Sequence, residues 1–293
     1  MRKWLIVVCL LALADFCGRV ASAEEPPQPQ RGVVYATRGD EPLEADIYLP
    51  AGEGPFPAVL VVHGGAWRSG SRTQMTFVAE RLAESGYVAV AISYRLAPRH
   101  KFPAQIEDCK SAVRWMRAHA KDYKIDPDQI AGWGYSAGGH LVALLGTTDA
   151  DDGLEGADAK PGDPSTRLQA VIAGGAPCDF REAPEESTQL AFWLDGARKN
   201  NPKAYEQASP RAYVTADDPP IFFYHGDADK LVQMASPEAM AADLKAAGVA
   251  TRLYVIPKAG HIQAIFDGAA GKEAIAFLDE HLKGKPAEST AAP

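Results

Sequence analysis

Apolar residues gather in short continuous runs along most of the chain. They occupy residues 57–63, 87–93, 129–134, 168–174, 220–225 and 250–256. Uninterrupted runs of this length are typical of parallel strands that are buried on both faces of a sheet. The runs therefore predict the strands of a parallel sheet.

Helical patterns separate most of these runs. In residues 103–120 the apolar positions recur at steps of three and four, which places one buried stripe on a helix: Ile106, Cys109, Val113 and Met116. Ser236 and Pro237 predict the start of another helix, with serine as the cap and proline at the first helical position. Alternating strands and helices imply a mostly parallel sheet with helices on both faces.

Three further segments depart from this alternation. Residues 33–37 and 43–49 flank turn residues and predict an antiparallel hairpin. Residues 147–167 form a predicted surface loop, and residues 182–218 form a longer, irregular insertion. Long connections often act as lids, so Phe192 and Trp193 are expected either to cover a binding site or to pack the insertion onto the body.

Composition indicates one globular domain, which we place at residues 32–284. The chain has 293 residues, of which 46% are hydrophobic, and this suffices for one large core. Its formal net charge is −8, without a basic stripe. Such a charge disfavours binding to nucleic acid or to an anionic membrane and favours neutral or weakly polar ligands.

The N-terminus has the pattern of a signal peptide. A charged start precedes a short apolar run, and Ala21-Ser22-Ala23 supplies a small-x-small cleavage site. We therefore expect residues 1–23 to be removed and the protein to be secreted or periplasmic, without stable membrane insertion. The alternative is an uncleaved membrane anchor. Residues 24–31 and 285–293 are expected to be flexible.

Cysteine usage indicates no metal site. Cys9 and Cys17 lie in the predicted leader, which leaves Cys109 and Cys178 in the mature chain, and no CxxC motif or Cys/His cluster is present. The remaining pair could form one disulfide or two buried free thiols.

Residues 134–138 read Gly-Tyr-Ser-Ala-Gly and match the G-x-S-x-G nucleophile motif. They lie between the predicted strand at 129–134 and a helix that begins near Ser136. A sharp turn at this point exposes the serine hydroxyl, and the helix N-terminus favours negative charge beside it. Ser136 is therefore the predicted nucleophile.

Residues 63–67, His-Gly-Gly-Ala-Trp, follow the strand at 57–63. A glycine-rich loop at this place can direct backbone N–H groups at a substrate oxygen. The predicted oxyanion hole comprises amides of this loop together with the amide that follows the nucleophile: Gly64, Gly65, Ala66 and Ala137. We expect the neighbouring Trp67 and Tyr135 to contact substrate, together with Phe192 and Trp193, and His63 to hold the loop.

Asp227 and Asp229 follow the strand at 220–225, and His261 follows the last strand. The order serine, aspartate, histidine fits a triad in which His261 is the base. Spacing alone does not decide which of the two aspartates is the third member of the triad. The other histidines are expected to be structural or at the surface: His100, His119, His140, His225 and His281. Tyr94, Arg95 and Asp108 are expected to tie loops together.

These motifs resemble the esterase and lipase branch of the α/β-hydrolases that includes feruloyl-esterase-like and hormone-sensitive-lipase-like proteins. The resemblance extends from about Gly32 to about Leu282, and it also rests on SYRLAP at 93–98, FPAQIED at 102–108, Ser209-Pro210 and HGDADKLV at 225–232. The family's G-x-x-D-x-x-V pattern implies that Asp229 is the acid. Ala66 and Tyr135 depart from the lipase-like pattern and favour the feruloyl-esterase-like relatives.

The resemblance implies an α/β-hydrolase fold with a short lid or insertion, and a serine esterase that needs no metal or organic cofactor. The expected substrates are short acyl esters, either small molecules or acetyl and feruloyl groups on plant polysaccharide. Two alternatives remain. The same triad could cleave amides, as formamidases and peptidases do, or the domain could be an inactive binding module.

Overall fold

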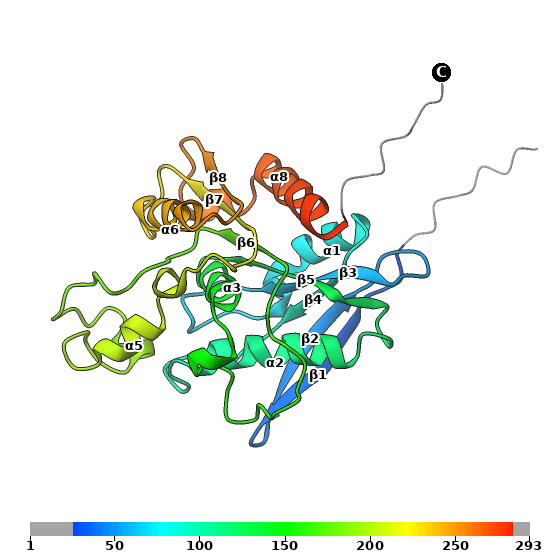
Figure 1. Ribbon diagram of the computed structural model, residues 1–293, viewed down its shortest axis with the longest axis horizontal. Helices are drawn as coiled ribbons and strands as arrows, with labels where there is room; N and C mark the ends of the chain where they lie inside the picture. Colours follow the sequence, from blue (N-terminus) through cyan, green and yellow to red (C-terminus); the bar gives the residue numbers. More distant parts are fainter. Residues whose placement is uncertain (1–25, 284–293) are drawn as a thin grey trace, which may run out of the picture.

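A single eight-stranded sheet organises the part of the chain that the computed structural model describes, residues 26–283. The strand order across the sheet is β1-β2-β4-β3-β5-β6-β7-β8 (Figure 1). The strands are β1 (Gln30–Arg38), β2 (Glu41–Tyr48), β3 (Phe56–Val62), β4 (Val88–Ile92), β5 (Ile125–Tyr135), β6 (Ala170–Gly174), β7 (Ile221–Gly226) and β8 (Thr251–Ile256). The predicted leader (1–23) and C-terminal tail (285–293) lie outside the described residues.

The six strands from β3 to β8 coincide with the six apolar runs and pair in parallel, so the predicted sheet is confirmed. The predicted hairpin is formed by β1 and β2, which pair antiparallel, and β2 also runs antiparallel to β4. β1 begins at Gln30, before the predicted domain boundary at Gly32. Arg31 is tied to the sheet because its guanidinium donates to Asp46 over 3.1 Å, so the predicted flexible segment is shorter than expected.

Helices cover both faces of the sheet. They are α1 (Thr76–Glu84), α2 (Ala104–Ala118), α3 (Ala137–Thr147), α4 (Ala191–Leu194), α5 (Pro202–Gln207), α6 (Ala235–Ala246), α7 (His261–Ala264) and α8 (Gly268–Leu278). Short turns of other helical types lie at Arg72–Met75, Ala150–Asp152, Pro210–Tyr213 and Asp279–Lys283. Residues of α2, α3 and α6 belong to the core of one face, and residues of α1 and α8 belong to that of the other.

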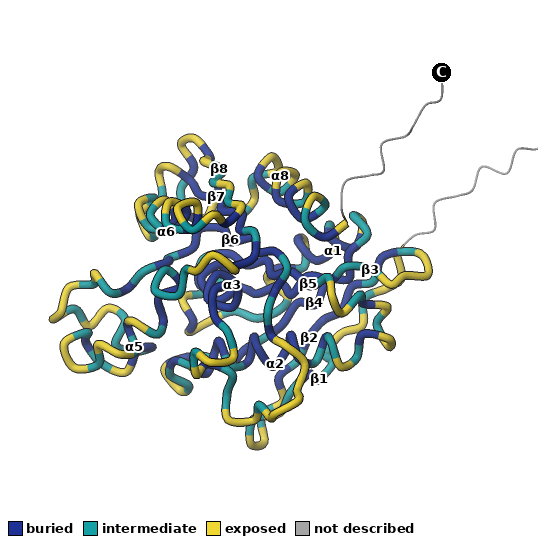
Figure 2. The backbone as a smooth tube through the Cα atoms, viewed as in Figure 1, coloured by how far each residue is buried: buried dark blue, intermediate teal, exposed yellow. Residues whose placement is uncertain are grey.

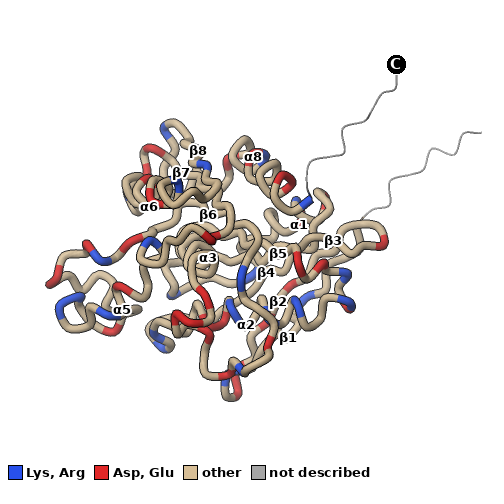
Figure 3. The backbone as a smooth tube through the Cα atoms, in the orientation of Figure 1, with Lys and Arg blue, Asp and Glu red and all other residues tan. Residues whose placement is uncertain are grey.

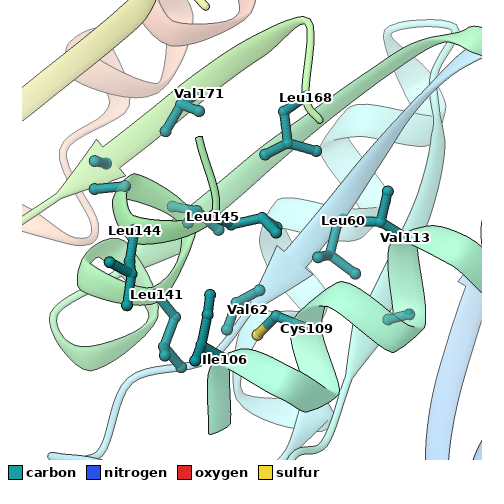
Figure 4. Close-up of a cluster of buried hydrophobic side chains, with 14 of the residues drawn as sticks. Leu60, Val62, Ile106, Cys109, Val113, Leu141, Leu144, Leu145, Leu168 and Val171 are labelled. Atoms are coloured by element: carbon teal, nitrogen blue, oxygen red, sulfur yellow. The ribbon is translucent and has the colours of Figure 1, made fainter. Parts of the chain in front are cut away.

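The core is deepest around α3, which is buried along its whole length (Figure 2). Side chains of β3, α2, α3 and β6 meet there in one apolar layer: Leu60, Val62, Ile106, Cys109, Val113, Leu141, Leu144, Leu145 and Val171 (Figure 4). Burial of each large aliphatic side chain contributes about 1.5–3 kcal/mol. This layer fixes the start of α3 against the end of β5.

The predicted start of α6 was wrong by two residues. The helix begins at Ala235, and Met234 occupies the cap position without a capping side chain. The hydroxyl of Ser236 instead accepts a hydrogen bond from the backbone N–H of Cys178 over 2.8 Å. Cys178 and Cys109 are both buried free thiols, and burial raises the pKa of Cys178 to about 12.

The insertion at 182–218 carries α4 and α5 and extends away from the sheet, at the left of Figure 1. Acidic and basic residues are interspersed along loops and outer helices (Figure 3). Across residues 26–283, every helix is too short or too polar to span a lipid bilayer.

Asp108 joins three segments of the fold: helix α2, which carries it, the loop that contains Arg95, and strand β1. Its side chain is fully buried on α2 and accepts hydrogen bonds from Nε and the backbone N–H of Arg95, over 3.0 and 2.9 Å. Arg38 of β1 also contacts it, over 3.4 Å. Arg95 and Asp108 thus tie loops together, as expected from the sequence.

We predict that Asp108→Ala destabilises the fold by about 3–5 kcal/mol, because the substitution leaves two partly buried guanidinium groups without their carboxylate. Urea unfolding followed by circular dichroism measures the change. Asp122→Ala, at an exposed position, should alter stability by less than about 0.5 kcal/mol. Equal effects of the two substitutions would contradict the role given to Asp108.

Candidate active site

The structure brings Ser136, His261 and Asp229 together at the C-terminal ends of the parallel strands. Ser136 lies between β5 and α3, Asp229 follows β7, and His261 follows β8. Ser136 Oγ is 2.9 Å from His261 Nε2, and His261 Nδ1 is 2.6 Å from Asp229 Oδ2. Because an ionised carboxylate only accepts hydrogen bonds, Nδ1 carries the proton and Nε2 is free to accept the serine proton.

Ser136 has a strained backbone, with φ 57° and ψ −121°. Two close approaches impose this conformation. A Cβ on Gly134 would lie 2.2 Å from the carbonyl oxygen of Gly138, and a Cβ on Gly138 would lie 2.1 Å from that of Val62. Only glycine fits at either place, so strand β5 turns sharply into α3 and presents the serine hydroxyl above the sheet.

Asp229 is held by the loop that follows β7. Its Oδ1 accepts from the backbone N–H groups of Leu231 and Val232, over 2.8 and 3.0 Å. Burial raises the pKa of Asp229, but these hydrogen bonds and the one from His261 outweigh burial and lower it overall. Asp227, the competing acid, is exposed and accepts from the backbone N–H of Lys258 over 2.6 Å, so it supports the histidine loop.

His225 contacts the same carboxylate from inside the sheet. Its Nε2 lies 2.9 Å from the carbonyl oxygen of Val232 and 3.3 Å from Asp229 Oδ2. A nitrogen facing these two acceptors must carry the proton. Burial lowers the pKa of His225, so the ring supports the loop as a neutral donor.

The loop of residues 63–67, called the oxyanion loop here after its predicted role, has an unusual backbone. Gly65 has φ 109°, and Ala66 and Trp67 have φ 51° and 58°. In the described part of the chain, the backbone N–H groups of Gly65, Ala66 and Ala137 have no hydrogen-bond acceptor. Ala137 is also the first residue of α3, where the helix dipole favours negative charge. These N–H groups are therefore free to donate hydrogen bonds to an anionic oxygen near Ser136.

Aromatic side chains that pack around Trp67 hold this loop in place. The indole of Trp67 stacks on that of Trp193, with ring centres 3.8 Å apart and planes within 1°. Trp67 Nε1 donates to Nδ1 of His140 over 3.1 Å, and His140 Nε2 donates to the carbonyl of Ala208 over 2.7 Å. Burial lowers the pKa of His140 to about 4, which keeps the ring neutral.

Of the two expected places for Trp193, a lid or the junction of insertion and body, the structure shows the second, so its predicted contact with substrate is wrong. It is fully buried and its Nε1 donates to Gln105 of α2 over 3.0 Å, so it packs the insertion onto the body. Phe192, its neighbour, is partly exposed and lines a cleft at Ser136. The two aromatic residues are adjacent in sequence, and burial is what separates their roles.

Tyr135 connects the nucleophile turn to the histidine loop. Its hydroxyl donates to the backbone oxygen of His261 over 2.5 Å, and the two rings lie 5.3 Å apart. Burial raises the pKa of Tyr135, so the hydroxyl remains a donor. Tyr135 also lines a cleft beside Ser136.

Two clefts open on Ser136 and His261. The first, of about 530 Å³, is mainly apolar and includes Gly64 and Gly65 in its lining. The second, of about 520 Å³, is lined by Trp67, Phe192 and several polar side chains. Arg68 borders both clefts, and its guanidinium lies 5.4 Å from the centre of the Phe192 ring.

Sequence reasoning missed most of the cleft lining. Met75 and the apolar residues that follow the histidine line the first cleft: Ile262, Ile265 and Phe266. The position of the last three residues directly after the predicted base, His261, was the signal that the sequence offered. Between residues 26 and 283, no group of three or more His, Cys, Asp or Glu side chains is arranged to hold a metal ion.

Known proteins resemble this chain over most of its length. The family model described as BD-FAE matches residues 45–244. Esterase LipC of Mycobacterium tuberculosis is 33% identical over 82% of this chain and 61% of its own length. The chain spans between half and about three fifths of the length of the first curated relatives, with shares of 61%, 51% and 59%.

Solved structures share the fold. A truncated carbohydrate esterase from gut microbiota has a TM-score of 0.81 and 26% identity, covering 89% of this chain and 99% of that one. The esterase Est2 of the planctomycete Thermogutta terrifontis, with butyrate bound, has a TM-score of 0.72 and 30% identity over 88% of this chain and 94% of its own. The predicted α/β-hydrolase fold is confirmed.

The lowered pKa of Asp229 predicts how stability depends on pH. The carboxylate stabilises the folded state fully above the unfolded pKa of about 4, and this contribution is lost as the pH falls through the lower folded value. The stability difference between wild type and Asp229→Asn should therefore shrink as the pH is lowered from 7 to 3. Urea unfolding across this range measures it, and a constant difference would contradict the lowered pKa.

Proposed function

The chain belongs to the BD-FAE family, and from this premise we propose that it is a serine hydrolase that cleaves carboxylic esters through an acyl-enzyme. One observation carries the proposal. A continuous chain of hydrogen bonds runs from Asp229 through His261 to Ser136, whose hydroxyl faces two clefts. Such an arrangement activates a serine for attack on a carbonyl carbon.

In the first half of the reaction, Ser136 Oγ forms a bond to the ester carbonyl carbon while its proton passes to His261 Nε2. The carbonyl oxygen becomes negative and accepts hydrogen bonds from the free amides near Ser136, to which Gly65, Ala66 and Ala137 contribute. The bond to the alcohol then breaks, and the imidazolium returns its proton to the leaving oxygen. An acyl group remains on Ser136.

In the second half, water attacks the same carbonyl carbon. His261 accepts the proton of the water, and the oxyanion again faces the loop amides. The bond to Ser136 Oγ then breaks, the serine regains its proton from the imidazolium, and the carboxylic acid leaves. Asp229 remains ionised throughout and stabilises the imidazolium, consistent with its lowered pKa.

We propose short acyl esters as substrates. The clefts beside Ser136 have volumes of about 530 and 520 Å³, which suits a small ligand. The structurally similar Est2 binds butyrate, and another neighbour is a carbohydrate esterase. Acetyl or feruloyl groups on plant polysaccharide are the finer form of this proposal, since the second cleft combines Phe192 with polar side chains.

The first test of the reaction is hydrolysis of 4-nitrophenyl acetate, butyrate and octanoate. Ser136→Ala and His261→Ala should lower kcat by about 10⁴-fold or more, because each removes a group that acts in both half-reactions. Asp229→Asn should lower it by about 10⁴-fold, because the base is then held in the wrong tautomer.

Asp227→Asn is the matched control, since Asp227 lies two residues from Asp229 and contacts only the loop backbone. It should lose far less activity than Asp229→Asn. Wild-type release of nitrophenol no faster than that of Ser136→Ala on all three esters would refute the esterase proposal, and amide substrates would then be assayed.

We also propose that the protein is exported, on the basis of the leader pattern in residues 1–23. Expression of the full chain in a Gram-negative host should yield a periplasmic or secreted product whose first residue is Glu24. Terminal sequencing of that product checks the cleavage site. Recovery of the intact chain with Met1 in the membrane fraction would favour the uncleaved anchor.

A further inference from the structure

Exposed apolar side chains gather beside the site. In the described part of the chain, six large apolar residues are exposed, and four of them line either the apolar cleft at Ser136 or a smaller cavity next to it: Phe77, Leu231, Ile262 and Phe266. Leu231, Ile262 and Phe266 are 74%, 64% and 67% exposed. Apolar surface concentrated in this way is typical of a binding site.

The smaller cavity lies next to the apolar cleft. Ile265 and Phe266 line both spaces, so these two side chains form the wall that the spaces share. The ring of Phe266 lies 5.4 Å from that of Phe77 on α1, at an interplanar angle of 38°. One path of apolar side chains therefore leads from Ser136 past Phe266 to the space between α1 and α8.

The distal cavity has a volume of about 100 Å³ and lies against the sheet. Trp133 of β5 and Tyr224 of β7 line it on the sheet side, and Ile275 of α8 lines it on the helix side. Gly271 of α8 also borders it. A Cβ at Gly271 would lie 2.8 Å from Nη1 of Arg81, which also lines the cavity, so a side chain at this position would have to displace that guanidinium.

We propose that this path binds the acyl chain of the ester, with the carbonyl at Ser136, and that the distal cavity extends the accepted acyl groups from the short chains proposed above to chains of medium length. The inference rests on the proposed function. Ala66 of the oxyanion loop lines both clefts, so the loop does not choose between them. The acyl side is assigned to the first cleft because its lining is mainly apolar, which suits an alkyl chain. The other cleft offers Gln189, Gln233 and Asp179 and suits a hydroxylated alcohol.

Two substitutions fill the distal cavity by different routes. Gly271→Leu adds a side chain from α8 after displacement of the Arg81 guanidinium, and Ile275→Trp enlarges a residue already in the lining. Ala276→Leu is the matched control, because it adds a similar side chain at an exposed position of the same helix. Unfolding curves select variants that fold like wild type.

The measurement is kcat/KM for 4-nitrophenyl esters from acetate to decanoate. Both filling variants should lower the ratio of octanoate to acetate by about tenfold or more, since a misfit of one methylene in an apolar pocket costs about 10- to 200-fold. Ala276→Leu should keep the wild-type ratio. A parallel series of alkyl acetates, from ethyl to octyl, examines the alcohol side in the same variants.

The outcomes separate this inference from the proposed function. An unchanged octanoate-to-acetate ratio in either folded variant would overturn the acyl path while the esterase proposal stands. A change confined to the alkyl acetates would also overturn it, because the path would then bind the alcohol. If neither filling variant folds, the wild-type enzyme should still hydrolyse the octanoate ester with a kcat/KM at least equal to that for the acetate ester, and a tenfold or greater preference for acetate would overturn the proposal. Absence of all wild-type ester hydrolysis would instead refute the proposed function.

Discussion

The close packing of backbone around Ser136 is the constraint on which the site depends. Gly134, Gly138 and Val62 approach one another so closely that no side chain fits between β5 and α3. The serine is forced into φ 57°, and the fully buried α3 behind it leaves no room for relaxation. The resulting strain is offset by the apolar layer that α2, α3 and β3 form, so the core of the domain holds the nucleophile in place.

Other elements are held around this fixed point by backbone N–H groups and by aromatic side chains. The amides of Leu231 and Val232 orient Asp229, and the hydroxyl of Tyr135 holds the backbone of His261. On the opposite side, the stacked pair of Trp67 and Trp193 supports the oxyanion loop. Each loop is thus anchored to the body close to the group that it presents, which holds the reacting atoms in position.

The two clefts divide the surroundings of Ser136 by polarity. Apolar side chains from the segment after His261 border one cleft, while Phe192, Gln189, Gln233 and Asp179 border the other. An ester joins two chemically distinct groups, and a site with one apolar and one mixed wall can orient such a substrate by polarity. Both walls come from loops and short helices, which vary without disturbing the sheet.

The sequence by itself determined the order of strands and helices, the nucleophile motif and the chain order of Ser136, Asp229 and His261, because these follow from local periodicity and short motifs. Spacing could not choose between Asp227 and Asp229, because both sit in one loop and only the fold decides which carboxylate meets Nδ1. Phe192 and Trp193 look alike in the sequence, yet one lines a cleft and the other is core. Tertiary structure alone assembled the apolar path from α1, β5, β7 and α8, since contacts between distant segments leave no local pattern.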